Sequence, residues 1–101
     1  MAIVWDDNKN RINIQKHGID FELAQDVFLD PDCLQRRDDD HSDEEERWQI
    51  MGMAQQVLFV VCTERGDDTL LITARKAEPK ERRIYYGDRT KYPKGWKSIN
   101  P

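Results

Sequence analysis

Apolar residues fall into a few short segments along the chain, and their spacing predicts the order of helices and strands. A β-prone run at 3–5 is followed by Asp6 and Asp7, either of which can cap a helix over 9–17. Apolar residues then recur at helical spacing over 21–28. The first third of the chain is therefore predicted to form a short strand and a two-helix hairpin.

Strand patterns dominate the rest of the chain. A weak one at 33–36 is followed by an alternating one at 47–53, an almost wholly apolar one at 56–63 and a fourth at 69–75. The continuous apolar run predicts a central strand that is covered on both faces. A short helix over 79–86 comes last, because it begins with a proline and a glycine follows it.

These elements run in the order β-α-α-β-β-β-β-α. We expect an α+β fold, in which the N-terminal two-helix hairpin and the C-terminal helix pack on an antiparallel sheet. The last three strands are expected to follow one another as a meander, and one face of the sheet is left available. Residues 1–87 are expected to form this domain, and residues 88–101 a basic and aromatic tail.

The composition allows one domain with a modest core. Of 101 residues, 38% are hydrophobic and 36% are charged, so the apolar side chains must be concentrated for the chain to fold. No run approaches the roughly 20 apolar residues of a membrane span, and no secretory signal pattern is present. We therefore expect a cytoplasmic protein without a membrane partner. Cys33 and Cys62 lack metal-ligand spacing, so neither a disulfide nor zinc is expected.

Charge is distributed unevenly along the chain. Up to residue 71 there are seven Lys or Arg against seventeen Asp or Glu, and beyond it nine against three. This asymmetry predicts either a phosphate-facing end with a separate acidic face, or a basic tail folded onto an acidic loop. The run at 38–46 is too charged to be buried and lacks the ligand pattern of a calcium loop. It is interpreted as a solvated loop or as an attractor for a basic partner, and His41 within it changes neither interpretation.

Basic and aromatic residues gather after the last predicted strand. They are Arg75, Lys76, Lys80, Arg82, Arg83, Tyr85 and Tyr86. Guanidinium groups bind phosphates and rings stack on unpaired bases, so this set favours single-stranded RNA. The alternative is an amphipathic helix with its charges in solvent and its tyrosines against the sheet. The tail is interpreted as a second RNA contact, a frayed end, or a strap whose Trp96 covers an apolar patch.

Lys16, His17 and Gly18 also allow two interpretations. The imidazole can accept a proton from an attacking hydroxyl, with the lysine nearby to stabilise negative charge on phosphorus. Basic residues in a last helical turn, followed by glycine, are equally typical of an ordinary helix end. The residues alone leave both interpretations open.

Several short motifs occur in a specific order between Ile3 and Tyr86. They are Trp5-Asp6, Lys9, Asn13, Lys16-His17-Gly18, Phe21, Ala24, Phe28-x-Asp30-Pro31, His41-Ser42, Glu45-Glu46-Arg47, Thr63-Glu64-Arg65-Gly66, Ala74-Arg75-Lys76-Ala77, Glu81-Arg82 and Tyr85. In this order and spacing the chain resembles the BrnT toxins of bacterial type II toxin-antitoxin pairs. The resemblance implies a RelE-like fold, a ribonuclease that cleaves mRNA and arrests translation, and an RNA substrate. It also implies a BrnA-like ribbon-helix-helix antitoxin, and the toxin is expected to contact operator DNA only through this antitoxin.

If the resemblance holds, the substrate's own 2′-hydroxyl attacks the adjacent phosphate without a metal or other cofactor. Arg75 and Arg82 then stabilise the charged phosphorane and Tyr85 stacks or transfers a proton. Lys16 or His17 acts as the general base. The competing function is a non-catalytic binding module that holds a DNA-binding antitoxin.

Two further arginines are expected to form a separate positive corner. Arg65 lies in a turn and Arg75 at the far end of the next strand, so at about 3.3 Å per residue they sit on the order of 20 Å apart. Arg47 begins a strand antiparallel to the central one and lies nearer Arg65. This corner is expected to hold flanking RNA or the antitoxin, although Arg65 can equally pair with Glu64 or Asp67 in the turn. The expected RNA-binding set is Arg47, Arg65, Lys76, Lys80 and Arg83.

Overall fold

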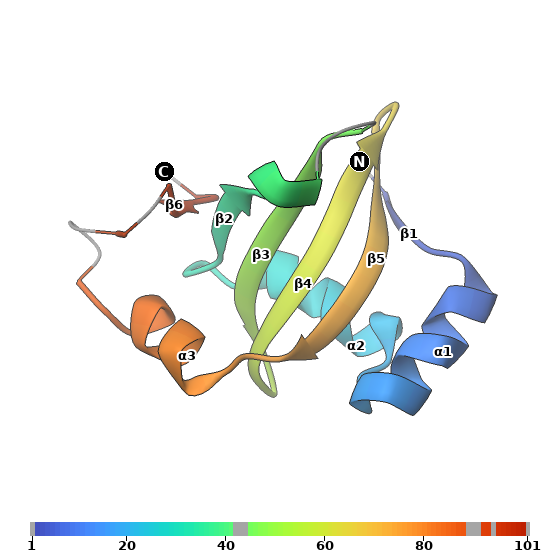
Figure 1. Cartoon of the computed structure of the whole chain (residues 1–101), viewed down its shortest axis with the longest axis horizontal. Helices are drawn as coiled ribbons and strands as arrows, with labels where there is room; N and C mark the ends of the chain where they lie inside the picture. Colours follow the sequence, from blue (N-terminus) through green and yellow to red (C-terminus); the bar gives the residue numbers. More distant parts are fainter. Residues whose placement is uncertain (1, 42–44, 89–91, 94, 101) are drawn as a thin grey trace.

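A single six-stranded sheet organises the molecule in the computed structural model, which describes residues 2–41, 45–88, 92–93 and 95–100 (Figure 1). The strand order is β1-β5-β4-β3-β2-β6. The elements are β1 (Ile3–Val4), α1 (Asp7–His17), α2 (Phe21–Ala24), η1 (Gln25–Leu29), β2 (Leu34–Arg37), η2 (Asp39–His41), β3 (Arg47–Ala54), β4 (Gln56–Arg65), β5 (Asp68–Lys76), α3 (Pro79–Tyr85) and β6 (Lys97–Ser98). The α+β class and the β3-β4-β5 meander are confirmed.

The prediction of a purely antiparallel sheet was wrong. β1 runs parallel to β5, with Ile3 opposite Thr69, and the Thr69 amide donates to the Ala2 carbonyl. Hydrophobic spacing identifies a strand but not its partner, and here the chain's first strand fills the outer edge of β5. The predicted element order also lacked β6, which pairs antiparallel with β2.

The second predicted helix is shorter than expected. Its α-helical part ends at Ala24 and continues as the 3-10 helix η1, because the chain tightens before Pro31 and the Asp30 amide donates to the Val27 carbonyl. η1 lies directly on β3. A Cβ atom at Gly52 would stand 2.8 Å from the Cβ of Val27, so only glycine permits this approach.

One face of the sheet, here called the back face, is sealed by an apolar core. α2 lies behind the sheet and α1 beside β5 (Figure 1). Phe21 and Val27 are fully buried in a cluster with the inward residues of β3, β4 and β5. This core includes both cysteines, and burial raises the pKa of each thiol to about 12. Both thiols are therefore closed to solvent, and this core serves to position the strands.

A buried amide fixes α1 to the edge of β5. The Asn13 side chain donates to the Ala74 carbonyl at 2.8 Å and accepts from the Ala74 amide at 3.1 Å. It also donates to the Ile19 carbonyl at 2.9 Å. Asn13 thus satisfies the backbone groups that a further strand would satisfy beyond the end of β1.

The opposite face of the sheet, here called the groove face, is only partly covered. α3 packs its buried Tyr85 there, and Trp96 from the C-terminal segment lies against Phe59 of β4. Trp96 is 3% exposed. Of the three interpretations of the tail, the described residues therefore agree with the strap; Arg89, Lys91 and Lys94 lie outside the described residues.

The acidic run was predicted to be too charged for burial, and this was wrong for Asp38, which is 6% exposed. Its amide donates to the Arg47 carbonyl, which extends the β2-β3 pairing by one residue. Its carboxylate oxygens lie within hydrogen-bond distance of His41 Nδ1. In the described part of the chain, no helix is both long and apolar enough to cross a membrane.

Candidate active site

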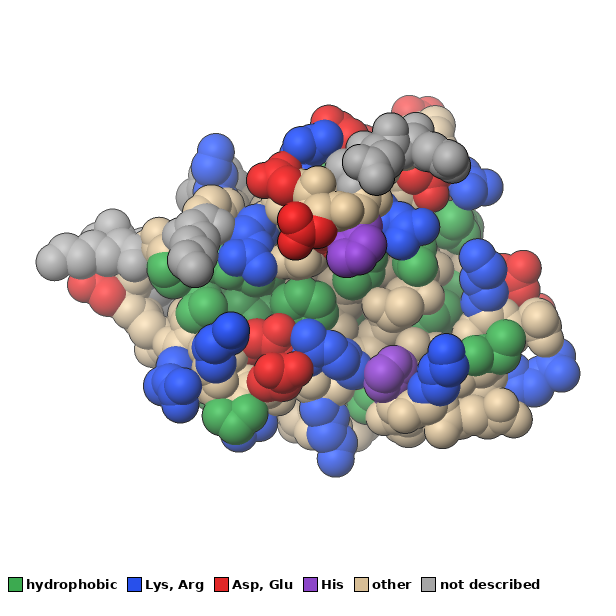
Figure 2. All heavy atoms as spheres, viewed as in Figure 1, with side chains coloured by type: hydrophobic (Ala, Val, Ile, Leu, Met, Phe, Trp, Pro, Cys, Tyr) green, Lys and Arg blue, Asp and Glu red, His purple; other side chains and the backbone are tan. Residues whose placement is uncertain are grey.

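A groove crosses the groove face between α3 and η2, with a volume of about 610 Å³. Apolar side chains form its middle and charged side chains stand on both sides, as Figure 2 shows for this face. The groove is lined by Arg36, Asp38, His41, Gln49, Phe59, Val61, Arg75, Glu78, Lys80, Glu81, Ile84, Pro93 and Trp96. Its volume lies within the roughly 300–1,000 Å³ of small-ligand pockets.

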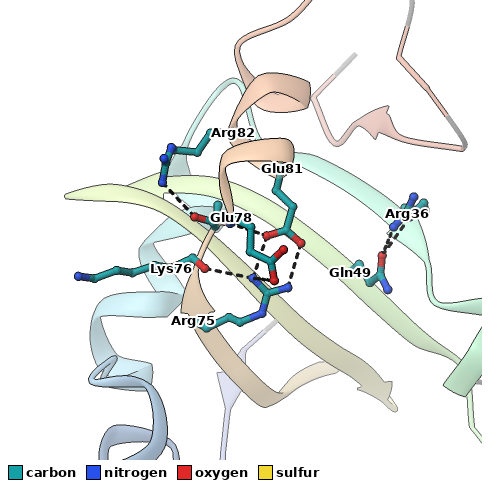
Figure 3. Close-up of polar contacts among 8 residues, drawn as sticks. Arg36, Gln49, Arg75, Lys76, Glu78, Glu81 and Arg82 are labelled. Atoms are coloured by element: carbon teal, nitrogen blue, oxygen red, sulfur yellow. Dashed lines mark hydrogen bonds and ion pairs between the residues drawn. The ribbon is translucent and has the colours of Figure 1, made fainter.

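Arg75 stands at one side of this groove, held by β5 and α3 (Figure 3). Its guanidinium carbon lies 4.3 Å from the centre of the Phe59 ring, the residue opposite it in β4. Nη1 and Nη2 donate to the two carboxylate oxygens of Glu81 at 2.8 and 2.9 Å. Nη1 also donates to the Lys76 carbonyl at 3.1 Å. The guanidinium is thus fixed before any ligand arrives.

The ion pair leaves one edge of Arg75 unused among the described residues. Glu81 takes the end-on edge, which consists of one N–H from each terminal nitrogen. Nε–H and the second N–H of Nη2 form the side-on edge, which suits bidentate contact with a phosphate. The Arg75 side chain is 29% exposed. Arg75 is therefore oriented by Glu81 and still has donors for a ligand.

The two partners keep each other charged. The hydrogen bond to Glu81 raises the pKa of Arg75 against the opposing effect of burial. Burial alone would raise the pKa of Glu81, but hydrogen bonds from Arg75 and from the Glu78 amide lower it overall. Glu81 also accepts from the Glu78 amide at 2.7 Å, as the reciprocal half of the capping box that begins α3.

A second guanidinium stacks on the other aromatic ring of the groove. Arg36 of β2 lies 4.5 Å from the centre of the Trp96 ring, and Trp96 packs edge to face on Phe59 at 6.3 Å. Arg36 Nε and Nη2 donate to the Gln49 side-chain oxygen at 3.0 and 2.7 Å. Arg36 and Gln49 are opposite each other in the β2-β3 register, so the sheet itself brings them together (Figure 3).

The third feature of the groove is a histidine beside a carboxylate. His41 Nδ1 lies 3.1 and 3.2 Å from the two carboxylate oxygens of Asp38. The Asp38 side chain is 7% exposed and that of His41 is 66% exposed. The pair therefore joins a buried acceptor to a ring that faces solvent at the groove.

Of the predicted site residues, the structure brings Arg75 and Lys80 together in the groove. Arg82 points away from Arg75 and Glu81 (Figure 3), and its Nη1 donates to the Ala77 carbonyl at 3.1 Å. Tyr85, the last residue of α3, is buried between this helix and the sheet, and its hydroxyl donates to Asp30 Oδ2 at 2.5 Å. Neither Arg82 nor Tyr85 lines the groove.

Lys16 and His17 occupy a different place. Both are exposed at the end of α1 and line a separate cavity of about 250 Å³ with Asn13, Ile72 and Thr73. Their location in the last turn of α1, before the left-handed Gly18, also fits an ordinary helix end.

The remaining predicted RNA-binding residues spread around the molecule. Arg65 lies six residues along β4 from Phe59, the residue opposite Arg75. Its guanidinium forms an ion pair with Glu45 at 3.7 Å and not with a carboxylate of its own turn. Arg47 is the first residue of β3 and lies opposite Thr63 of β4, which is two residues before Arg65. Arg83 lines a third cavity, of about 380 Å³, which Lys80 shares. Lys76 extends away from Arg75 (Figure 3).

Several groove residues were missed from the sequence. Arg36 and Gln49 lie on the adjacent strands β2 and β3 and become neighbours only through the register. His41 lies three residues after Asp38, and this spacing inside the charged run was the signal available for the pair. Among the described residues, no group of three His, Cys, Asp or Glu side chains is placed to hold a metal ion.

Comparisons with known proteins bear on the whole of this arrangement. The sequence pattern of a family described as the ribonuclease toxin, BrnT, of type II toxin-antitoxin systems matches residues 5–81. A crystal structure of the Brucella abortus ribonuclease toxin BrnT superposes with a TM-score of 0.60 at 27% sequence identity. The match covers 77% of this chain and 97% of that one. Comparison with curated protein sequences gave no match.

Proposed function

The chain belongs to the BrnT family of ribonuclease toxins of type II toxin-antitoxin systems, and from that premise we propose that its groove is the active site of an endoribonuclease. The enzyme cleaves mRNA in the cytoplasm without a metal and so arrests translation. The observation that carries the proposal is the position of Arg75, which is fixed by Glu81 and Phe59 at the side of a groove with its side-on edge left for a phosphate.

The reaction needs little more than positioning and positive charge. In the proposed step the ribose 2′-hydroxyl attacks the adjacent phosphorus, and negative charge builds on the phosphate oxygens. Arg75 contacts those oxygens through Nε and Nη2, and Lys80 adds charge from α3. Because Arg75 is already held by Glu81 and Phe59, little side-chain reorganisation accompanies the reaction.

The opposite side of the groove supports binding of a nucleotide chain. Arg36 stacks on Trp96 and donates to the side-chain oxygen of Gln49, which orients its guanidinium at this side of the groove. Arg82 and Tyr85 lie outside the groove and have no part in the proposed step. The corner formed by Arg47 and Arg65 is proposed to contact flanking RNA or the antitoxin, at a distance from the scissile phosphate.

Cleavage by the purified chain tests this function. We expect it to cut single-stranded RNA in the presence of EDTA and to leave 2′,3′-cyclic phosphate and 5′-hydroxyl ends. Arg75→Ala should lower the rate on the order of 10²-fold or more, whereas Arg11→Ala, which removes an exposed arginine from α1, should not. Absence of cleavage by the folded wild-type chain would remove the enzyme and leave the non-catalytic binding module.

The family also implies an antitoxin partner. We propose a small BrnA-like ribbon-helix-helix protein that neutralises the toxin and binds operator DNA for both. Induced expression of this chain alone should stop growth and fragment transcripts. Co-expression of the neighbouring small gene should restore growth and keep transcripts intact. Growth arrest that the neighbouring gene does not relieve would contradict the pairing. The RelE-like character of the fold stays a prediction from the resemblance.

A further inference from the structure

We propose that His41, oriented by Asp38, is the general base that removes the proton from the attacking 2′-hydroxyl. The inference rests on the proposed ribonuclease function and assigns a residue to one of its steps. His41 is the catalytic residue and Asp38 a positioning residue. Both line the groove that contains Arg75.

The hydrogen bond fixes which nitrogen of the ring is available. His41 Nδ1 lies within 3.2 Å of both Asp38 oxygens. An ionised carboxylate only accepts hydrogen bonds, so the proton of the neutral ring sits on Nδ1 and the lone pair on Nε2. Nε2 is therefore the atom that can take a proton from a substrate hydroxyl.

The backbone holds this pair in place from both sides. The Asp38 amide donates to the Arg47 carbonyl at 2.8 Å, which anchors the carboxylate at the end of β2. The His41 amide donates to the Asp38 carbonyl at 3.3 Å and closes the turn η2 over it. The three-residue spacing between the aspartate and the histidine thus places the ring beside the Asp38 carboxylate within one short turn.

The surroundings suit a base that works opposite a phosphate. The charged side chains that line the groove with the pair are Arg36 from β2, Arg75 from β5, and Glu78, Lys80 and Glu81 from the segment that forms α3. Arg75 is paired with Glu81 and also lies 3.9 Å from a carboxylate oxygen of Glu78, while Arg36 and Lys80 bring two further cations to the groove. A phosphate bound by these cations and its neighbouring ribose would lie in the same groove as His41.

The other histidine has a different environment. The described residues that line the cavity of His17 include Lys9 and Lys16 but no aspartate or glutamate. A ring there has no carboxylate among the cavity-lining residues to fix its tautomer, and it is not in the cavity of Arg75. The geometry therefore favours His41 over His17 for the proton transfer.

The proposed cleavage transfers two protons and exchanges one bond at phosphorus for another. His41 Nε2 takes the 2′-hydroxyl proton, the 2′ oxygen forms a bond to phosphorus, and the bond from phosphorus to the 5′ oxygen breaks. The 5′ oxygen takes a proton from water, and the imidazolium returns its proton to the solvent. The products are a 2′,3′-cyclic phosphate and a 5′-hydroxyl.

Kinetics of full-length variants test the assignment. His41→Gln should lower the single-turnover cleavage rate about 10²- to 10⁴-fold, which is the usual contribution of a general base. Its affinity for a 2′-O-methyl RNA, which cannot be cleaved, should equal that of the wild type. Asp38→Asn should lower kcat with KM unchanged, and Asp40→Asn in the same turn should change neither. In the His41→Gln background, Asp38→Asn should have no further effect on the rate, because it acts only through the ring.

The outcomes separate the inference from the function on which it rests. Wild-type cleavage together with an equally active, folded His41→Gln variant would overturn the role of His41 and leave the ribonuclease standing. Loss of cleavage in His17→Gln with His41→Gln active would do the same. A loss of RNA affinity equal to the loss of rate would make His41 a binding residue. No cleavage by the wild type would overturn the function itself, and thermal melts of each variant exclude loss of fold as the cause.

Discussion

The back face and the groove face of the sheet hold their residues in place by different means. On the back face, Phe21 and Val27 are fully buried among apolar neighbours, and the buried side-chain amide of Asn13 has backbone partners. On the groove face, Arg36 and Arg75 lie over aromatic rings, and hydrogen bonds to Gln49 and Glu81 orient them. Both faces bury apolar side chains, and the difference is that the groove face also keeps charged groups ordered yet accessible.

The largest effect should follow from emptying the back face. Phe21→Ala removes a fully buried ring and should lower the free energy of unfolding by about 3–5 kcal/mol. Leu29→Ala removes a side chain that is 80% exposed and should change it by less than about 0.5 kcal/mol. Urea denaturation measures both. Equal effects from the two variants would contradict the assignment of Phe21 to the core of the back face.

The groove face should respond in activity and not in stability. Arg75→Lys keeps a positive charge but loses the side-on edge and the bidentate contact with Glu81, so RNA cleavage should fall on the order of 10²-fold. The midpoint of urea unfolding should move little. Retention of full activity by the lysine variant would mean that charge alone, without the fixed geometry, is sufficient.

A smaller loss of stability is expected at the edge of β5. Asn13→Ala leaves the amide and carbonyl of Ala74 without their side-chain partners and should lower the free energy of unfolding by about 1–3 kcal/mol. Cleavage per folded molecule should stay unchanged. A loss of cleavage with normal stability would place α1 in the active machinery instead.

The smallest effect is a dependence of stability on pH through Glu81. Its pKa is lowered in the folded state, so its contribution is present above the ordinary value of 4.5 and is lost as the pH falls through the folded pKa. The stability difference between wild type and Glu81→Gln should therefore shrink from pH 7 to pH 3 in urea titrations. A difference that stays constant over this range would show that the ion pair with Arg75 contributes no net stability.

Much of the fold could be predicted because hydrophobic spacing records which residues turn inward. The strands β3, β4 and β5 follow directly from that spacing, and the helix α3 follows from the proline at its start and the glycine after it. The parallel pairing of β1 with β5 could not be predicted, because a two-residue strand contains no information about its partner. The burial of Asp38 was missed for a similar reason, since it depends on a hydrogen bond across the sheet to Arg47.

The candidate site was less predictable than the fold. Arg75 was found because a basic cluster follows the last long strand. Arg36 and Gln49 meet only through the β2-β3 register. Trp96 comes from the C-terminal segment, and its place under Arg36 depends on how that segment crosses the sheet. A site assembled from distant segments can be predicted only when the strand register is known, and composition and spacing do not give that register.

The most direct test of the central claim is to map where RNA binds on the folded chain. The measurement is the amide chemical-shift change of isotope-labelled protein on addition of a short, uncleavable 2′-O-methyl RNA. We expect the largest changes at Arg36, Gln49, Phe59 and Arg75, with little change around α1. Changes centred on Lys16, His17 and Ile72, with the groove unaffected, would contradict the assignment of the active site.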